Sequence, residues 1–271
     1  PAFNPLISHV SGLAAAQRLA QFDATALALA DAFWPGPLTL VLPKTLRCPV
    51  ADIATAGLDT VAVRIPAHPL ARAILDAFGG AVVAPSANLS GHVSPTTAAH
   101  VQGDLAGRID LIVDGGPVQV GVESTIVGCF GAPILLRPGG VPREAIERVL
   151  GRALMALPEN PGTDDGQPLA PGMLASHYAP STRVRLDAAS VEPGEALLAY
   201  GPASLPGLDT AAAVMNLSER GDLTEAAANL FSYLRALDVE HARAIAVMPV
   251  PNDGLGEAIN DRLRRAAVPR S

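Results

Sequence analysis

The stretch AVVAPSANLSG at residues 81–91 decides how the rest of the chain is interpreted. Its four small apolar residues are typical of the end of a buried strand, and Pro85 ends the backbone hydrogen bonding. Ser86, Asn88 and Ser90 follow at alternate positions, which predicts three short polar side chains on one side of an extended segment. Such groups at the carboxyl end of a strand are typical of ligand sites in α/β sheets. An ordinary turn rich in Ser and Asn is the alternative, and the stretch taken alone favours it.

The chain has 271 residues, enough to bury a full core and to form two domains. Hydrophobic residues make up 49% and charged residues 17%, which indicates a globular chain. No apolar run approaches the roughly 20 residues of a membrane-spanning helix. Cys48 and Cys129 are the only cysteines, which argues against a disulfide framework or a sulfur-rich zinc site. We therefore expect a cytoplasmic location.

The net charge of −7 gives no overall basic field that attracts nucleic acid or an anionic membrane. Neither is expected as a stable direct partner. Lys44 is the only lysine of the chain, and the other basic residues are arginines. Arginines and backbone amides would therefore carry most of any phosphate binding.

Apolar and β-branched runs alternate with helical patterns in the N-terminal half. Strands are predicted to end near residue 10 and at 38–42, 60–66, 81–84 and 109–113, followed by a hairpin of 124–127 with 134–137. Helices are predicted over 11–31, 68–78 and 142–151. A further helix is predicted to begin at Ser94 as its N-cap, with Pro95 as its first residue. These elements predict an α/β fold for residues 1–154.

Residues 155–181 are rich in Pro and Gly and predict a linker. From residue 182 onward the pattern restarts, with strands at 184–186, 196–200, 213–217 and 245–248, a helix over 223–237 and a last helix after Gly256. This alternation predicts a small parallel α/β domain over 182–271. Arg262, Arg264 and Arg265 are expected to complement the end of the last helix and to face solvent.

The usual catalytic motifs are missing: there is no G-x-S-x-G, no G-x-x-x-x-G-K loop and no paired metal-binding histidines. Instead, hydroxyl, amide and guanidinium groups stand at predicted strand ends, namely Thr60, Arg64, Ser86, Asn88, Ser94, Ser124 and Arg137. Such groups suit phosphates and a carboxylate but supply no obvious nucleophile. The pattern predicts catalysis by positioning and charge stabilisation, as in nucleotidyl or phosphoryl transfer.

Six ordered motifs resemble the L-threonylcarbamoyladenylate synthase (YrdC-like) family. They are Asn4-Pro5-Leu6-Ile7-x-His9-Val10, Trp34-Pro35-Gly36-Pro37-Leu38-Thr39, Val61-Ala62-Val63-Arg64-Ile65-Pro66, Pro85-Ser86-Ala87-Asn88-x-Ser90-Gly91, Ser124-Thr125-Ile126-Val127 and Leu136-Arg137-Pro138-Gly139. The linker through His177-Tyr178-Ala179-Pro180 and the later Gly254-Leu255-Gly256 segment resemble the two-domain branch of that family. The resemblance implies a YrdC-like twisted mixed sheet followed by a small Rossmann-like domain.

The resemblance implies an enzyme that joins L-threonine, bicarbonate or carbon dioxide, and ATP into threonylcarbamoyl-adenylate and pyrophosphate. Mg²⁺ would assist on the phosphates, with no metal ligand from protein side chains. The product would pass to the downstream tRNA threonylcarbamoyl transferase machinery, which makes threonylcarbamoyladenosine in tRNA.

The resemblance also implies a role for each matching residue. Threonine would be held by His9, Arg64, Ala84 and Ser124, with Arg64 on its carboxylate. ATP would be bound by Asn4, Thr60, Ser86, Ser94, Arg137 and Tyr178, the last as a lid from the linker. Arg64, Ser86 and Asn88 are the expected catalytic residues. The family also carries a Lys-x-Arg pair just before the Pro-x-x-Asn-Pro segment, so we expect the sequence to be N-terminally incomplete.

Three other functions compete with this interpretation. An RNA-binding module would need basic and aromatic residues interleaved on one surface, which the acidic chain does not show. A carbamoyl-transfer enzyme with another acceptor resembles the hydrogenase-maturation proteins, whose acylphosphatase and zinc-finger segments are missing. A nicotinamide enzyme would need more glycines and a ribose-binding acid in the C-terminal domain.

Overall fold

The computed structural model describes residues 4–155, 170–171, 178–238 and 242–268. Two compact units interleave along the chain. The first consists of Pro1–Pro85 and Glu123–Leu174, and the second of Ser86–Val122 and Ala175–Ser271. The predicted linker 155–181 lies largely outside the described residues, and the predicted domain boundaries stay predictions.

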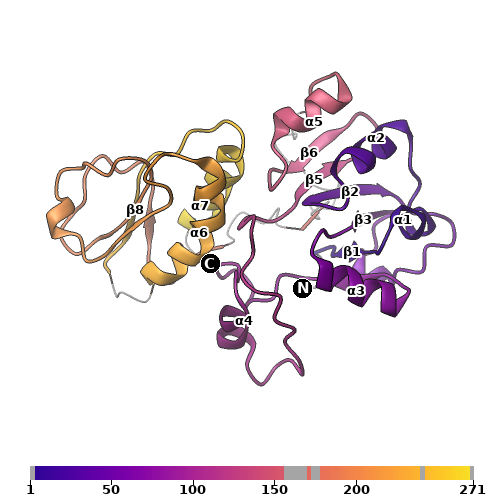
Figure 1. The fold of residues 1–271 in the computed structure, drawn as a ribbon, viewed down its shortest axis with the longest axis horizontal. Coiled ribbons are helices and arrows are strands. Elements are labelled where there is room, and N and C mark those ends of the chain that lie inside the picture. Colours follow the sequence, from indigo (N-terminus) through magenta and orange to yellow (C-terminus); the bar gives the residue numbers. More distant parts are fainter. Residues whose placement is uncertain (1–3, 156–169, 172–177, 239–241, 269–271) are drawn as a thin grey trace. The chain divides into compact units, whose positions relative to one another are not determined.

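The first unit is built on a six-stranded mixed sheet in the order β4-β1-β3-β2-β5-β6 (Figure 1). The strands are β1 (Ile7–His9), β2 (Leu38–Pro43), β3 (Thr60–Arg64), β4 (Val82–Ala84), β5 (Thr125–Gly128) and β6 (Ile134–Arg137). β1 runs parallel to β3 and β2 runs parallel to β5, while the other neighbours are antiparallel. The predicted hairpin of β5 and β6 is confirmed.

One face of this sheet is covered by helices, because alternate residues of each strand are apolar on that side. Leu40, Leu42, Val61 and Val63 pack there with buried residues of α1 (Leu13–Leu19), α2 (Ala24–Phe33) and α5 (Arg143–Leu150). The opposite face carries a smaller apolar cluster that includes Ile7, Val41, Ala62 and Ile126. The helices therefore account for the main core of the first unit.

The stretch at residues 81–91 is only partly as predicted. β4 is an edge strand that pairs with β1 alone, and all three of its residues are exposed, so the prediction of a buried strand is wrong. After Pro85 the chain bends and turns, and the Asn88 side-chain amide donates to the backbone carbonyls of Leu89 and His92 at 2.9 Å each. The turn reading is therefore correct, and the extended reading of residues 86–90 is wrong.

The helix predicted over 11–31 is two helices, α1 and α2. The Asp23 carboxylate accepts a hydrogen bond from the Ala26 amide at 2.7 Å, so a new N-cap interrupts the apolar pattern. The helix α3 (Pro69–Phe78) is confirmed. Residues 109–113 do not form a strand, and no strand of the described residues pairs with them.

The second unit contains a four-stranded parallel sheet in the order β7-β10-β8-β9. Its strands are β7 (Val184–Arg185), β8 (Ala196–Ala199), β9 (Val214–Asn216) and β10 (Ile245–Val247), with α4 (Ala98–Leu105), α6 (Leu223–Asp238) and α7 (Gly256–Ala267) as helices (Figure 1). The predicted mixed α/β sheet followed by a small parallel α/β domain is confirmed. No helix of the described residues is long and apolar enough to cross a membrane.

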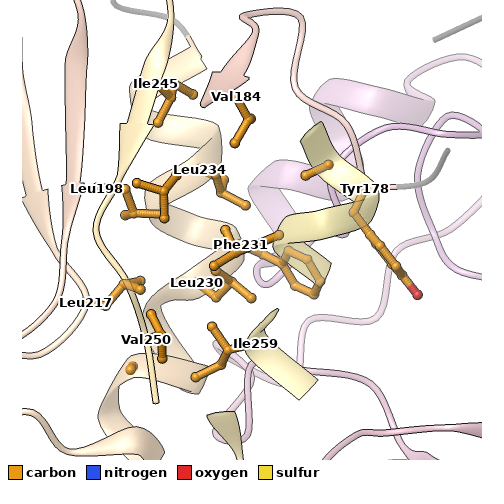
Figure 2. Packing of buried hydrophobic residues seen from close by; sticks show 14 of the residues in the cluster. Tyr178, Val184, Leu198, Leu217, Leu230, Phe231, Leu234, Ile245, Val250 and Ile259 are labelled. Carbon is orange, nitrogen blue, oxygen red and sulfur yellow. The ribbon is translucent and has the colours of Figure 1, made fainter. Parts of the chain in front are cut away.

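The core of the second unit joins α6, α7 and the sheet, and Figure 2 shows Tyr178 beside Phe231 in it. Their rings are stacked with centroids 5.4 Å apart. The Arg262 guanidinium lies 5.2 Å from the Tyr178 ring centroid and is fully buried. The prediction that Arg262 faces solvent is therefore wrong. Its spacing from Ile259 and Ala266 places it on the buried face of α7.

Candidate functional site

Several predicted site residues of the first unit lie on the sheet face that the three helices leave uncovered, which we call the site face. Thr60, Ala62 and Arg64 occupy every second position of β3, so their side chains lie on the same face of the sheet. Ala62 belongs to the smaller apolar cluster, which places Thr60 and Arg64 on the site face. His9 lies in register beside Arg64. Arg64 ends β3 and Thr60 begins it, about 13 Å away at the usual strand rise.

Arg64 is the central cation of the site face. Its Nε donates to the Gly36 carbonyl oxygen at 3.0 Å, which fixes the guanidinium at the end of β3. Burial and the nearby positive charge of Arg137 lower the pKa of Arg64 to about 10. Within the described residues no carboxylate pairs with Arg64. Two neighbouring guanidinium groups on a partly buried surface favour an anionic ligand.

His9 is uncharged at neutral pH. Burial and the neighbouring Arg64 lower the pKa of His9 to about 4. Its Nδ1 is buried and has no hydrogen-bond partner within the described residues. A buried polar atom without a hydrogen-bond partner is typical of a position where a ligand or a water molecule forms the missing hydrogen bond. His9 therefore offers a neutral hydrogen-bonding group beside a cation.

The lowered pKa of His9 predicts a specific dependence of stability on pH. Between pH 6.5 and about 4 the unfolded chain binds a proton at His9 that the folded chain does not, so stability falls as pH falls through this window. We expect His9→Asn to remove a slope of up to about 1.4 kcal/mol per pH unit there. Urea unfolding of wild type and variant at pH 7.5 and 5 measures the difference, with the exposed His68→Asn as control. Equal pH dependence in wild type and His9→Asn contradicts the assignment.

Ser124 and Arg137 form one buried network at the start of β5 and the end of β6. Arg137 donates to the Ser124 carbonyl through Nε at 3.2 Å and Nη2 at 2.8 Å, and Nη2 also contacts the Ser124 hydroxyl at 3.2 Å. The Ser124 hydroxyl lies 2.8 Å from the Thr39 hydroxyl. Thr39 was not among the predicted site residues. Its signal is a threonine at a fully buried position in an otherwise apolar strand.

Gly139 lets the chain after β6 pass close to Ser124. A Cβ at residue 139 would lie 2.4 Å from both the Glu123 carbonyl oxygen and the Thr125 amide nitrogen. No side chain fits between these backbone atoms, so the glycine in the Leu136-Arg137-Pro138-Gly139 motif is required by packing. It fixes the backbone on both sides of Ser124.

Asn4 and Ala84 complete the predicted residues of the first unit. Ala84 is the last residue of β4 and pairs with Ile7 of β1, and Ala84 is exposed. The Asn4 Oδ1 atom is buried and has no hydrogen-bond partner within the described residues. The structure therefore brings His9, Arg64, Ser124 and Arg137 to the same end of the strands, in one row across the sheet, whereas Thr60 and Ala84 lie toward the other end of their strands.

The remaining predicted residues belong to the second unit. Ser86 is exposed, and Asn88 closes the turn that follows it. Ser94 is buried and is not an N-cap: α4 begins after Thr97, whose hydroxyl accepts the His100 amide at 3.2 Å. Tyr178 adopts a left-handed backbone conformation with φ 62° and is buried in the core of its own unit. The nucleotide roles of these residues stay predictions.

No group of three or more His, Cys, Asp or Glu side chains within the described ranges is arranged to hold a metal ion. The donors of the site face are guanidinium, imidazole, hydroxyl and amide groups. These groups suit a carboxylate or phosphates and do not suit Mg²⁺, which prefers oxygen anions.

Comparisons with known proteins identify the family of the chain. The family model described as "Telomere recombination" matches residues 1–139, and the one described as "Threonylcarbamoyl-AMP synthase, C-terminal domain" matches residues 141–268. Threonylcarbamoyl-AMP synthase of Bacillus subtilis (strain 168) is 39% identical over 98% of this chain and 80% of its own length. The protein of the same name from Pyrococcus abyssi (strain GE5 / Orsay) is 40% identical over 98% of this chain and 81% of its own length.

A solved structure supports the same assignment. The crystal structure of P. abyssi Sua5 complexed with L-threonine matches with a TM-score of 0.86 and 38% sequence identity, covering 98% of this chain and 81% of that chain. The two family models together span both units, and the identity extends over nearly the whole chain. The chain therefore belongs to the threonylcarbamoyl-AMP synthase family.

Proposed function

We propose that this protein condenses L-threonine, bicarbonate or carbon dioxide, and ATP into threonylcarbamoyl-AMP and pyrophosphate. The observation that carries the proposal is the pair of guanidinium groups of Arg64 and Arg137 beside the neutral imidazole of His9. This arrangement fits a ligand with a carboxylate, and a relative of 38% identity has a structure complexed with L-threonine. The product would serve the formation of threonylcarbamoyladenosine in tRNA.

The reaction needs no covalent intermediate with the protein. The threonine amine attacks carbon dioxide and loses a proton to give a carbamate. A carbamate oxygen then attacks the α-phosphorus of ATP, and the bond from this phosphorus to the β-phosphate oxygen breaks to release pyrophosphate. The protein must hold two anions close together and stabilise the negative charge of the transition state.

The residues on the site face divide these tasks in our proposal. Arg64 binds the threonine carboxylate through two parallel hydrogen bonds, while His9, Ser124 and the Ala84 backbone orient the rest of the amino acid. Arg137 binds ATP together with Asn4 and Thr60. Ser86, Asn88, Ser94 and Tyr178 stay predicted contributors to nucleotide binding and catalysis.

Mg²⁺ would be held by the triphosphate oxygens of ATP, because the donors of the site face are neutral or positive. When bound, it would neutralise phosphate charge. The downstream partner in our proposal is a tRNA threonylcarbamoyl transferase, since an acyl-adenylate is an activated donor for group transfer. A cytoplasmic location stays a prediction.

The proposal is tested by pyrophosphate release from ATP in the complete protein. We expect release to require both L-threonine and bicarbonate, and mass spectrometry to detect threonylcarbamoyl-AMP. Pyrophosphate release that is unchanged when either substrate is omitted contradicts the proposed function. D-Threonine serves as the matched control, because it has the same charge and the opposite configuration.

A further inference from the structure

Arg235 of α6 joins the C-terminal domain to the segment that contains Ser94. Its Nε donates to the Ser94 carbonyl at 3.2 Å, and its Nη2 donates to the Val93 carbonyl. The same guanidinium forms a two-pronged ion pair with Asp104 of α4, with N–O distances of 3.2 and 2.6 Å. One side chain therefore fixes two consecutive carbonyls and the helix that follows them.

A second contact from α6 supports the same segment. The Ser232 hydroxyl lies 2.6 Å from the Thr96 hydroxyl, which also lies 3.1 Å from the His100 Nδ1 atom. Ser232 precedes Arg235 by three residues, so both side chains lie on one face of the helix. Ser94 and Thr96 are 6% and 3% exposed. Helix α6 therefore holds residues 93–96 through two backbone carbonyls and through the Thr96 side chain.

These contacts differ from ordinary surface ion pairs. The side chains of Arg235 and Asp104 are 18% and 15% exposed, compared with 76% and 40% for the pair of Arg220 and Glu225. Exposed pairs contribute little to stability, whereas partly buried charged hydrogen bonds fix geometry more strongly. The hydrogen bond from Arg235 also lowers the pKa of Asp104, which favours the charged carboxylate of Asp104. A lone arginine near a helix end would complement the helix dipole without binding carbonyls of a distant segment.

We propose that Arg235 is a positioning residue for the nucleotide: it holds residues 93–96 so that Ser94 is presented to ATP. This inference rests on the proposed function and on the proposed role of Ser94. It assigns a task to the C-terminal domain, whose helix α6 supports the ATP-binding segment. Loss of the guanidinium should therefore weaken ATP binding and leave threonine binding nearly unchanged.

The test compares Arg235→Gln and Arg235→Lys in the complete protein. We expect Arg235→Gln to raise the KM for ATP about 10-fold or more, because small displacements of positioning groups have large effects. The KM for L-threonine should change less than about twofold, since threonine contacts lie on other residues. Arg235→Lys should raise the KM for ATP less than Arg235→Gln does, because an ammonium keeps the positive charge but cannot form the two parallel hydrogen bonds of a guanidinium. Arg220→Gln, which breaks the exposed pair, is the matched control.

Hydrogen exchange at the amides of residues 93, 94, 96 and 97 provides a readout that does not depend on turnover. Faster exchange in Arg235→Gln, but not in Arg220→Gln, shows that Arg235 holds this segment, whereas the selective rise in the KM for ATP shows that the held segment serves the nucleotide. A wild-type protein that fails the test of the proposed function would leave the first result standing and overturn the second. Equal increases in KM for both substrates, or unchanged exchange with unchanged KM for ATP, overturn the inference. Circular dichroism at the assay temperature confirms that each variant is folded.

Discussion

Replacing Arg64 with alanine is expected to raise the KM for L-threonine about 30- to 1000-fold, which corresponds to about 2–4 kcal/mol. Arg64 is held at the end of β3 by the Gly36 carbonyl and has no carboxylate partner within the described residues. The threonine carboxylate would supply that partner in our proposal. Pyrophosphate release at varied threonine and ATP concentrations measures the effect.

The two substrates must respond differently for this role to hold. We expect the KM for ATP to change less than about threefold, because Arg64 is not a proposed nucleotide ligand. Arg64→Lys should be intermediate, since it keeps a charge but cannot form two parallel hydrogen bonds. The exposed Arg72→Ala on α3 is the control. An equal loss for threonine and ATP would count against the assigned role.

Replacing Arg137 with methionine is expected to lower both stability and activity. Methionine cannot donate the hydrogen bonds that the Arg137 guanidinium donates to the carbonyl and hydroxyl of Ser124. The buried Ser124 carbonyl then lacks these donors. We expect a loss of about 3 kcal/mol in the free energy of unfolding. Because Ser124 and Arg137 both belong to the proposed site, kcat/KM should fall at least about 100-fold.

Urea unfolding and steady-state kinetics separate the two effects of Arg137→Met. Activity is compared at a temperature where the variant is folded, and Arg148→Met on the exposed side of α5 serves as control. Full activity in a destabilised variant would restrict Arg137 to a structural role. Unchanged stability would show that the network with Ser124 contributes little.

Much of the fold follows from the sequence because the apolar periods of its strands and helices are regular. β2, β3 and the hairpin of β5 and β6 lie where their apolar runs predict them, and the parallel C-terminal domain follows from its alternating pattern. Residues 109–113 have the composition of a strand without a paired neighbour in the described residues. Strand composition alone does not determine pairing, because a strand needs a hydrogen-bonded partner.

The errors within elements have local causes. Ser94-Pro95 and Thr97 both have the residue types of a helix start, and the helix begins after Thr97. Arg235 donates a hydrogen bond to the Ser94 carbonyl, and sequence periodicity does not reveal such a tertiary contact. Arg262 is different, because its position on the apolar stripe of α7 was visible in the sequence. The charge of Arg262 alone predicts a solvent-facing side chain, but its contact with the Tyr178 ring permits burial.

The candidate site was predictable as a set of residues but not as an arrangement. Alternation along β3 predicts that Thr60 and Arg64 share a face, whereas the neighbour relation of His9 and Arg64 depends on the parallel pairing of β1 with β3. Thr39 was missed because its contact with Ser124 joins residues that are 85 positions apart in the sequence. Such long-range pairs are set by sheet order.

A crystal structure of the complete protein with L-threonine tests the central claim most directly. We predict that the threonine carboxylate lies within hydrogen-bond distance of the Arg64 guanidinium, with the rest of the amino acid beside His9 and Ser124. Threonine bound away from the site face, with Arg64 making no contact to it, would contradict the account.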